Sequence, residues 1–188
     1  MNADKIVVGL AGMPGSGKSL VVNAARQLGY AIIVMGDVVR EETVKRGLDL
    51  TPTNVGKVML ELRAEGGNTV VASKCVPKIE EQASAKVLVD GLRSLHEADA
   101  FKKHFAKFTV AAVHASPETR FSRLFCRRRS DDPDGWVVFR ERDIRELSVG
   151  LGDVIAMAEQ LIVNDNSAED AKFAAKKALE RIESKWIK

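Results

Sequence analysis

The sequence predicts an α/β fold, a three-layer α/β/α sandwich with a five-stranded parallel sheet. Two observations support this fold class. Apolar, β-branched runs recur along the chain without the polar alternation of a half-exposed strand, and stretches of helical periodicity separate them. A glycine-rich segment, G-x-x-x-x-G-K-S at residues 12–19, follows the first apolar run and precedes a helical pattern. Buried strands joined by helices form parallel sheets with right-handed crossovers, and ligands bind at the carboxyl ends of the strands.

The first part of the chain supplies two strand–helix units. A strand is predicted over residues 6–11, and the helix after the glycine-rich segment carries apolar residues at helical spacing from 20 to 28. A second strand is predicted over residues 31–35. Asp37 follows it, and we expect this aspartate to cap the next helix.

Residues 38–82 show helical spacing around breaks at Gly47 and at Gly66-Gly67, and no clear strand. Residues 70–72 could form a strand, but the pattern favours a helix that Pro77 kinks or restarts. The sequence therefore predicts a small helical insertion after the second strand.

The second half of the chain contains three more predicted strands, at residues 86–89, 108–113 and 160–163. Helices are expected between them. Apolar residues from 171 to 186 lie on one helical stripe, which predicts a terminal helix packed on the sheet.

The composition is that of a soluble globular protein, with 45% hydrophobic and 29% charged residues among 188. This length suits one domain over residues 1–188. The net charge of +3 does not imply a nucleic-acid or membrane partner, and the first apolar run is too short for a signal or membrane helix. Cys75 and Cys126 lack metal-ligand spacing, as expected of reduced thiols in a cytoplasmic protein. The oligomeric state stays open.

Residues 12–19 match the Walker A phosphate loop of P-loop NTPases. Glycines let successive backbone N–H groups point at phosphate oxygens, and the following helix adds the positive end of its dipole. We therefore expect ATP phosphates to contact Gly12, Met13, Pro14, Gly15, Ser16, Gly17, Lys18 and Ser19. Lys18 supplies a mobile charge for the β- and γ-phosphates, and the Ser19 hydroxyl can ligate Mg²⁺.

The strand at residues 86–89 ends in Asp90, as in a Walker B motif. A carboxylate at this place can hold Mg²⁺ beside the phosphate loop. An aspartate that merely caps a loop is the alternative. The sequence predicts a magnesium site built from Ser19 and Asp90.

Two segments, Gly36-Asp37-Val38-Val39-Arg40 and Asp90-Gly91-Leu92-Arg93-Ser94, each place an arginine after a strand. A planar guanidinium binds two phosphate oxygens at once. With these segments the chain resembles the adenylate kinases and related nucleoside monophosphate kinases. The resemblance implies that Asp37, Arg40 and Arg93 bind the acceptor nucleotide, next to an acceptor-binding region at residues 38–82. The family's proline before the second arginine is missing here, and Arg40 could instead pair with a neighbouring glutamate.

Arginines are dense at residues 123–140, where the family has its lid. Residues 122–127 resemble the lid arm D-R-x-x-x-R, and residues 129–132 resemble the R-x-D-D that follows the lid. The resemblance implies that the transferring phosphoryl group is stabilised by Arg123, Arg127, Arg129 and Arg140. A solvated basic face is the alternative. Longer members carry a hairpin or zinc-bearing insert here, so this chain has a very short lid-like arginine region.

Asn164 follows the last predicted strand in a segment that resembles the I-x-N turn of small phosphate-loop kinases. The resemblance places this residue near the donor base. A turn built from Asn, Asp and Ser side chains is an equally good interpretation.

The resemblance as a whole implies a kinase that uses ATP and Mg²⁺ to phosphorylate a small nucleotide acceptor, in a short-lid group of archaeal proteins. A dephospho-CoA kinase is the nearest alternative, in which the position of Asp37 would serve as the base toward a hydroxyl. A slow ATPase that acts as a switch or assembly factor is a third possibility. The sequence leaves the acceptor open.

Overall fold

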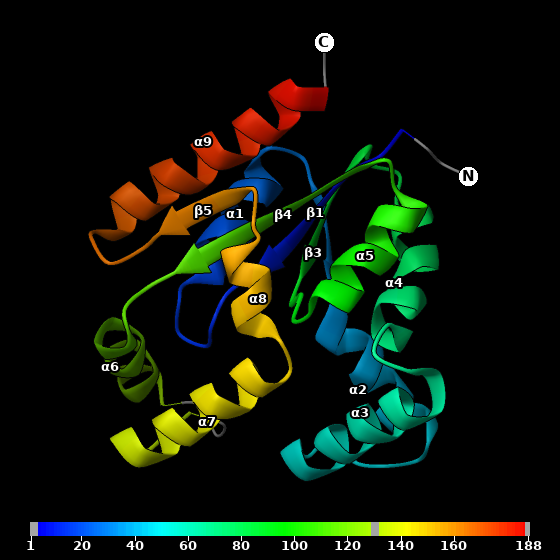
Figure 1. Cartoon of the computed structure of the whole chain (residues 1–188), viewed down its shortest axis with the longest axis vertical. Coiled ribbons are helices and arrows are strands. Elements are labelled where there is room, and N and C mark those ends of the chain that lie inside the picture. The colour runs from blue at the N-terminus through cyan, green and yellow to red at the C-terminus, as the bar shows by residue number, and fades with distance from the viewer. Residues whose placement is uncertain (1–3, 129–131, 187–188) are drawn as a thin grey trace.

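The computed structural model describes residues 4–128 and 132–186, and it confirms the predicted fold class (Figure 1). The five strands form one sheet in the order β2-β3-β1-β4-β5, and all four neighbouring pairs are parallel. The strands are β1 (Ile6–Ala11), β2 (Ala31–Val34), β3 (Lys86–Asp90), β4 (Lys107–His114) and β5 (Gln160–Val163).

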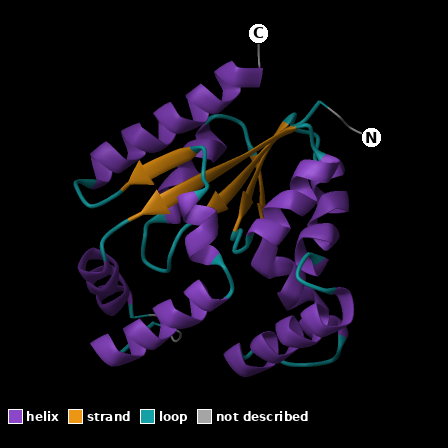
Figure 2. Ribbon diagram, viewed as in Figure 1, coloured by secondary structure: helices purple, strands orange, loops and turns teal. Residues whose placement is uncertain are grey.

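The helices are α1 (Lys18–Gln27), α2 (Met35–Lys45), α3 (Pro52–Gly66), α4 (Val70–Glu80), α5 (Leu95–His104), α6 (Pro117–Arg127), α7 (Trp136–Ser148), α8 (Leu151–Ala156) and α9 (Ala168–Trp186). They cover both faces of the sheet (Figure 2). Helices α1 and α9 pack on one face and on each other, while α2, α4, α5 and α8 pack on the other face. None of the helices within the described residues is long and apolar enough to span a membrane.

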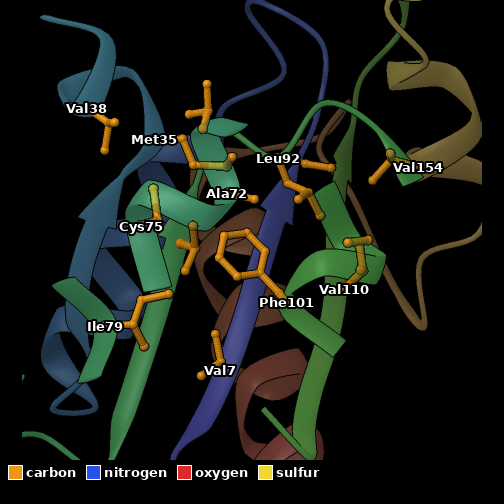
Figure 3. Close-up of a cluster of buried hydrophobic side chains, with 14 of the residues drawn as sticks. Val7, Met35, Val38, Ala72, Cys75, Ile79, Leu92, Phe101, Val110 and Val154 are labelled. Carbon is orange, nitrogen blue, oxygen red and sulfur yellow. The ribbon is translucent and has the colours of Figure 1, made fainter. Parts of the chain in front are cut away.

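The larger core fills the space between the sheet and α2, α4 and α5 (Figure 3). Phe101 of α5 is fully buried, and its ring stacks on Phe108 of β4 with centroids 5.6 Å apart. Val7 on β1 and Ile79 on α4 lie in the same cluster. Strand residues are buried here because helices cover them from both sides, which explains their unbroken apolar runs.

Helix α2 begins earlier than the sequence predicts, and Asp37 does not cap it. β2 ends at Val34, which is itself the N-cap, and Asp37 lies in the first turn of the helix. Met35 and Val38 are both buried against the sheet. The helix starts at Met35 because this register buries both side chains.

The helical prediction for residues 38–82 is confirmed, since α2, α3 and α4 occupy most of it. Residues 70–72 belong to α4, which continues through Pro77. The strand alternative was wrong because Val71, Cys75 and Ile79 are buried at helical spacing.

The carboxyl ends of the strands point toward α3, α6 and α7 (Figure 1). β1 lies at the centre of the sheet, and the register pairs its Leu10 with Asp90 at the end of β3. The chain leaves β1 toward α1, while its two neighbours in the sheet are β3 and β4. A crevice at such a point is where open parallel sheets bind ligands.

Candidate active site

The phosphate loop joins β1 to α1 and requires glycine at several positions. Gly15 has φ +81°, and a Cβ there would lie 2.7 Å from the Arg120 carbonyl oxygen. Gly17 has φ +94°, and a Cβ there would collide with the amide nitrogen of Asn164. The loop is therefore pressed against its neighbours, and side chains are excluded where the backbone must bend.

Lys18 folds back across this loop. Its Nζ donates hydrogen bonds to the carbonyl oxygens of Gly12 at 2.6 Å and Met13 at 3.5 Å. Burial lowers the pKa of Lys18, and the nearby Asp90 carboxylate opposes that shift. The ammonium group is thus held at the loop.

Three buried polar groups around the loop have no hydrogen-bond partner among the described residues: Ser16 Oγ, Asp90 Oδ1 and Arg123 Nη1. A buried polar group without a partner is costly, and it indicates a ligand or water that completes the site. Burial raises the pKa of Asp90, while Lys18 and Arg93 lower it. These donors and acceptors fit a bound triphosphate with Mg²⁺.

Three cavities meet at Lys18. The first, about 530 Å³, is lined by the amino-terminal part of α1 and by α6, and it brings together Ser19, Asp90, Arg123 and Arg127. Ser19 and Asp90, the residues of the predicted magnesium site, therefore lie on the wall of one cavity. Gly15, Gly17 and Lys18 of the phosphate loop line it as well.

The second cavity, about 290 Å³, lies between the end of β3 and the helices α2, α3 and α4. Its charged lining includes Arg40, Arg63, Arg93 and Asp90. The apolar part of its wall consists of Val34, Met35, Val39, Val55, Met59 and Val71. This cavity suits a ligand that has both an anionic group and an apolar surface.

The arginines of the second cavity are already paired. Arg40 donates two hydrogen bonds to Asp37, and this pair is about half exposed. Arg63 lies 3.6 Å from the buried carboxylate of Glu97, which also accepts a hydrogen bond from the Arg93 backbone N–H. Arg40 pairs with Asp37 and not with Glu41 or Glu42, the partners that the sequence suggested.

Sequence reasoning missed Arg63 and Glu97. Arg63 is one of several charged residues in α3, and nothing in its immediate sequence separates it from the exposed ones. Glu97 gave a usable signal, because Ser94 and Glu97 form an S-x-x-E helix start in which Ser94 Oγ accepts the Glu97 N–H.

The third cavity, about 240 Å³, is strongly cationic. Its charged lining consists of Lys18, Arg93, Arg127, Arg142 and Glu146. The Glu146 carboxylate lies 3.4 Å from Arg93. Three arginines thus converge near the lysine of the phosphate loop, one from the loop after β3, one from α6 and one from α7.

Asp132 holds two of these arginines. Its carboxylate accepts hydrogen bonds from Arg127 Nε at 2.9 Å and Nη2 at 2.5 Å, and lies 3.9 Å from Arg142 Nη1. The Asp132 side chain is almost fully buried. The carboxylate therefore keeps both guanidinium groups together.

Arg140 and Arg129 do not join this group in the described structure. Arg140 is exposed on α7 and lines none of the three cavities, and Arg129 lies outside the described residues. Arg142, which the sequence analysis did not select, lies at the cavity in its place. Phe139 and Asp143 are the buried residues of α7, and Arg142 and Glu146 are four residues apart on the adjoining face. The four-residue spacing of Arg142 and Glu146 is visible in the sequence and indicates that both side chains lie on one face of the helix.

Asn164 lies beneath the phosphate loop, almost fully buried. Its Nδ2 donates to the Ser16 carbonyl oxygen at 2.8 Å, and its Oδ1 accepts from Arg123 Nη2 at 3.3 Å. It thus links the loop to the arginine of α6. Its observed partners are thus a backbone group of the phosphate loop and a side chain of α6.

Comparisons with known proteins agree with this geometry. A protein-family model described as an AAA domain matches residues 11–140. A solved shikimate kinase from Acinetobacter baumannii, in complex with shikimate, is 19% identical, covers 99% of this chain and 97% of its own, and has a TM-score of 0.64. A gluconokinase from Sinorhizobium meliloti is 14% identical with a TM-score of 0.60, and 97% of this chain and 95% of its own are covered. These likenesses show a shared P-loop kinase-like fold.

Two curated relatives are much more similar in sequence. The UPF0200 protein of Hyperthermus butylicus is 47% identical over 180 residues, which cover 96% of each chain. The UPF0200 protein MJ1399 of Methanocaldococcus jannaschii is 48% identical over 167 residues, 88% of this chain and 84% of its own. The chain therefore belongs to the UPF0200 family, and its AAA domain runs from the end of β1 into α7.

Proposed function

We propose that this protein is a small-molecule kinase that transfers the γ-phosphoryl group of ATP to the phosphate of a nucleoside monophosphate. One observation carries the proposal. The cavities beside the phosphate loop and beside α2, α3 and α4 share Lys18 and Asp90, and arginines surround both. Two phosphate-bearing ligands could therefore meet at this lysine.

On the donor side, the loop N–H groups and Lys18 would bind the triphosphate. The Ser19 hydroxyl and the Asp90 carboxylate would hold Mg²⁺, which supplies positive charge to the phosphate oxygens when bound. The unpartnered Asp90 Oδ1 and Arg123 Nη1 support this role, because a ligand would give both groups a partner. The buried Asn164 would keep Ser16 and Arg123 in place.

On the acceptor side, Arg40 and Arg93 would bind the acceptor phosphate, and Arg63 extends the same wall. Asp37 would orient Arg40, its present partner. The apolar side chains of α2 and α3 would contact the flat part of a base. An anionic acceptor needs no protein nucleophile, so positioning and charge stabilisation suffice.

The arginines near the third cavity would stabilise charge on the transferred group. Arg123, Arg127 and Arg142 belong to elements that adjoin Lys18. Arg140 and Arg129 stay predictions from the sequence pattern. Fixed guanidinium groups are effective here because they need not reorganise while charge shifts.

A hydroxyl acceptor is the second candidate, and Asp37 favours it. Asp37 belongs to the first turn of α2, and its carboxylate accepts two hydrogen bonds from Arg40, which lines the second cavity. It could take the proton of an alcohol such as the ribose hydroxyl of dephospho-CoA. The similar folds of a shikimate kinase and a gluconokinase are compatible with such an acceptor.

The deciding experiment is an assay of ADP release with Mg²⁺ and ATP over AMP, CMP, UMP, GMP, dephospho-CoA, shikimate and gluconate. We expect turnover with at least one monophosphate and a loss of at least about 100-fold in the Lys18→Met variant. Turnover with a hydroxyl acceptor alone would replace the first candidate by the second.

A variant with Arg40→Ala and Arg93→Ala separates a kinase from a switch. We expect it to lose acceptor-dependent turnover but to keep ATP binding, because both side chains line the second cavity and neither lines the first, where the triphosphate would bind. Slow ATP hydrolysis that ignores every acceptor and is unchanged in this variant would instead favour a nucleotide-dependent switch.

A further inference from the structure

A buried ion pair joins the two arginine-bearing helices next to the site. Arg120 of α6 and Asp143 of α7 are 4% and 3% exposed. Arg120 Nη1 donates to Asp143 Oδ1 at 2.8 Å, and Nη2 donates to Oδ2 at 2.6 Å. This is the bidentate geometry in which guanidinium and carboxylate bind most strongly and with the most defined orientation.

The same guanidinium also contacts the phosphate loop. Arg120 Nη1 donates to the Pro14 carbonyl oxygen at 3.3 Å, and Nε donates to the Ala115 carbonyl oxygen at 3.2 Å. The guanidinium carbon of Arg120 also lies 5.0 Å from the centroid of the Phe139 ring on α7. One side chain thus links the loop, the end of β4 and α7.

Packing alone would hold α7 less specifically. Phe121, Trp136 and Phe139 form an aromatic cluster between α6 and α7, with ring centroids 5.2 to 5.5 Å apart. Such contacts tolerate sliding, whereas a two-point ion pair fixes direction and register. Two buried charges are not needed for stability, since apolar side chains of similar size can replace such a pair.

We propose that Arg120 and Asp143 are positioning residues that hold α7, and with it Arg142, in register with the phosphate loop. Asp143 is adjacent to Arg142 in the helix, so a shift of the ion pair moves the guanidinium that lines the cationic cavity. The proposal rests on the proposed phosphoryl transfer for its kinetic consequence. Where the adenylate kinases have a long movable lid, this chain has α7, which carries Arg142 and is linked to the phosphate loop through Arg120.

The first test replaces the pair by apolar residues, Arg120→Met with Asp143→Leu, so that no lone charge stays buried. We expect the variant to fold, to keep its KM for ATP within about 3-fold, and to lose about 10- to 100-fold in kcat. A matched control replaces Lys86 and Glu183, a partly buried pair between β3 and α9, by Met and Leu. The control pair touches none of the three cavities, so kcat should be unchanged.

A thermodynamic cycle with Arg142→Ala tests positioning directly. In the natural sequence, Arg142→Ala should lower kcat by about 100-fold, but in the apolar-pair background by at most about 10-fold, because Arg142 is already out of place. Equal losses in both backgrounds would overturn the proposal. Arg120→Lys repeats the test in a form that keeps the charge but lacks the fork that reaches both Asp143 and Pro14.

Hydrogen exchange with Mg²⁺ and ATP gives a readout that does not depend on turnover. We expect ATP to slow exchange in α1 and α7 of the natural protein, but only in α1 of the apolar-pair and Arg120→Lys variants. If α7 is protected equally in all of them, or in none, the positioning proposal fails. If α7 protection depends on Arg120 but no acceptor is phosphorylated, the proposed kinase function fails while the positioning role stands.

Discussion

The buried carboxylate of Asp90 lowers the stability of the ligand-free fold, and it lies on the wall of two cavities beside the phosphate loop. One of its carboxylate oxygens is buried without a partner among the described residues, at the end of β3 beside Lys18. Natural proteins keep such groups where a ligand completes them, and the price is stability of the free protein.

We therefore expect Asp90→Asn to stabilise the ligand-free protein at neutral pH. Burial raises the pKa of Asp90 in the folded state above its ordinary value of 3.8, so the folded protein binds this proton more tightly than the unfolded chain. Protonation of Asp90 therefore increases the free energy of unfolding. This contribution is fully present below pH 3.8 and is lost as the pH rises through the pKa of Asp90 in the folded state. Thermal denaturation should show a higher Tm for the variant at pH 7.5, with the difference shrinking toward pH 4, and Mg²⁺-dependent turnover should be lost. A lower Tm at pH 7.5 would contradict the desolvation argument.

The two arginines at positions 140 and 142 should differ in function. Arg142 lines the cationic cavity next to Lys18, while Arg140 is exposed and lines none of the three cavities. We expect Arg142→Ala to lower kcat by about 100-fold, as the loss of a fixed donor to a transition state does. Arg140→Ala should have a much smaller effect. The reverse order in steady-state assays would favour the assignment made from the sequence pattern.

At the scale of elements, the phosphate loop depends on contacts with α6 as well as on its own glycines. Gly15 has a left-handed φ, and its α-carbon faces the Arg120 backbone carbonyl. The loop and α6 are therefore one packed unit, with Arg120 and Asn164 linking it to α7 and to the end of β5.

Gly15→Ala should disturb this unit. A Cβ at 2.7 Å from a backbone oxygen cannot be relieved by a side-chain rotation, and φ +81° is unfavourable for alanine. We expect a loss of about 1–3 kcal/mol in the free energy of unfolding and weaker binding of ATP, measured by urea denaturation and calorimetry. Gly56→Ala is the matched control, because Gly56 lies in α3 with no atom within 4 Å of the added Cβ. There we expect no loss, or a gain of up to about 1 kcal/mol.

At the scale of the whole molecule, the order of the strands gathers the site. β1 lies between β3 and β4, so the loop after β1 lies beside Asp90 from β3 and the α6 arginines that follow β4. Elements that are far apart in the chain thus face one another across the carboxyl ends of the strands.

Binding of Mg²⁺ and ATP should stabilise the whole fold through this site. A ligand that binds only the folded state adds about 2.7 kcal/mol at 100 times its Kd. We expect Tm to rise with the concentration of Mg²⁺ and ATP. The rise should disappear in the Lys18→Met variant, because Lys18 is the ammonium group held at the phosphate loop. A rise of equal size in the variant would mean that the triphosphate binds elsewhere.

The fold class, the phosphate loop and Asp90 were predictable because their signals are local. An apolar run, a glycine spacing and a strand that ends in a carboxylate occupy a few consecutive residues, and steric and hydrogen-bonding rules act at that range. The helical insertion was predictable for the same reason, since Val71, Cys75 and Ile79 repeat at helical spacing.

The sequence by itself determined that a phosphate loop joins a central strand to a helix, because neighbouring residues dictate that geometry. Only the tertiary structure decided which charged side chains meet there: Arg142 and Arg63 line the cavities, Arg140 does not, and Arg120 ties α7 to the loop. The physical reason is the range of the interactions. A helix carries charges on all sides, and packing against distant elements determines which of them are buried at the site.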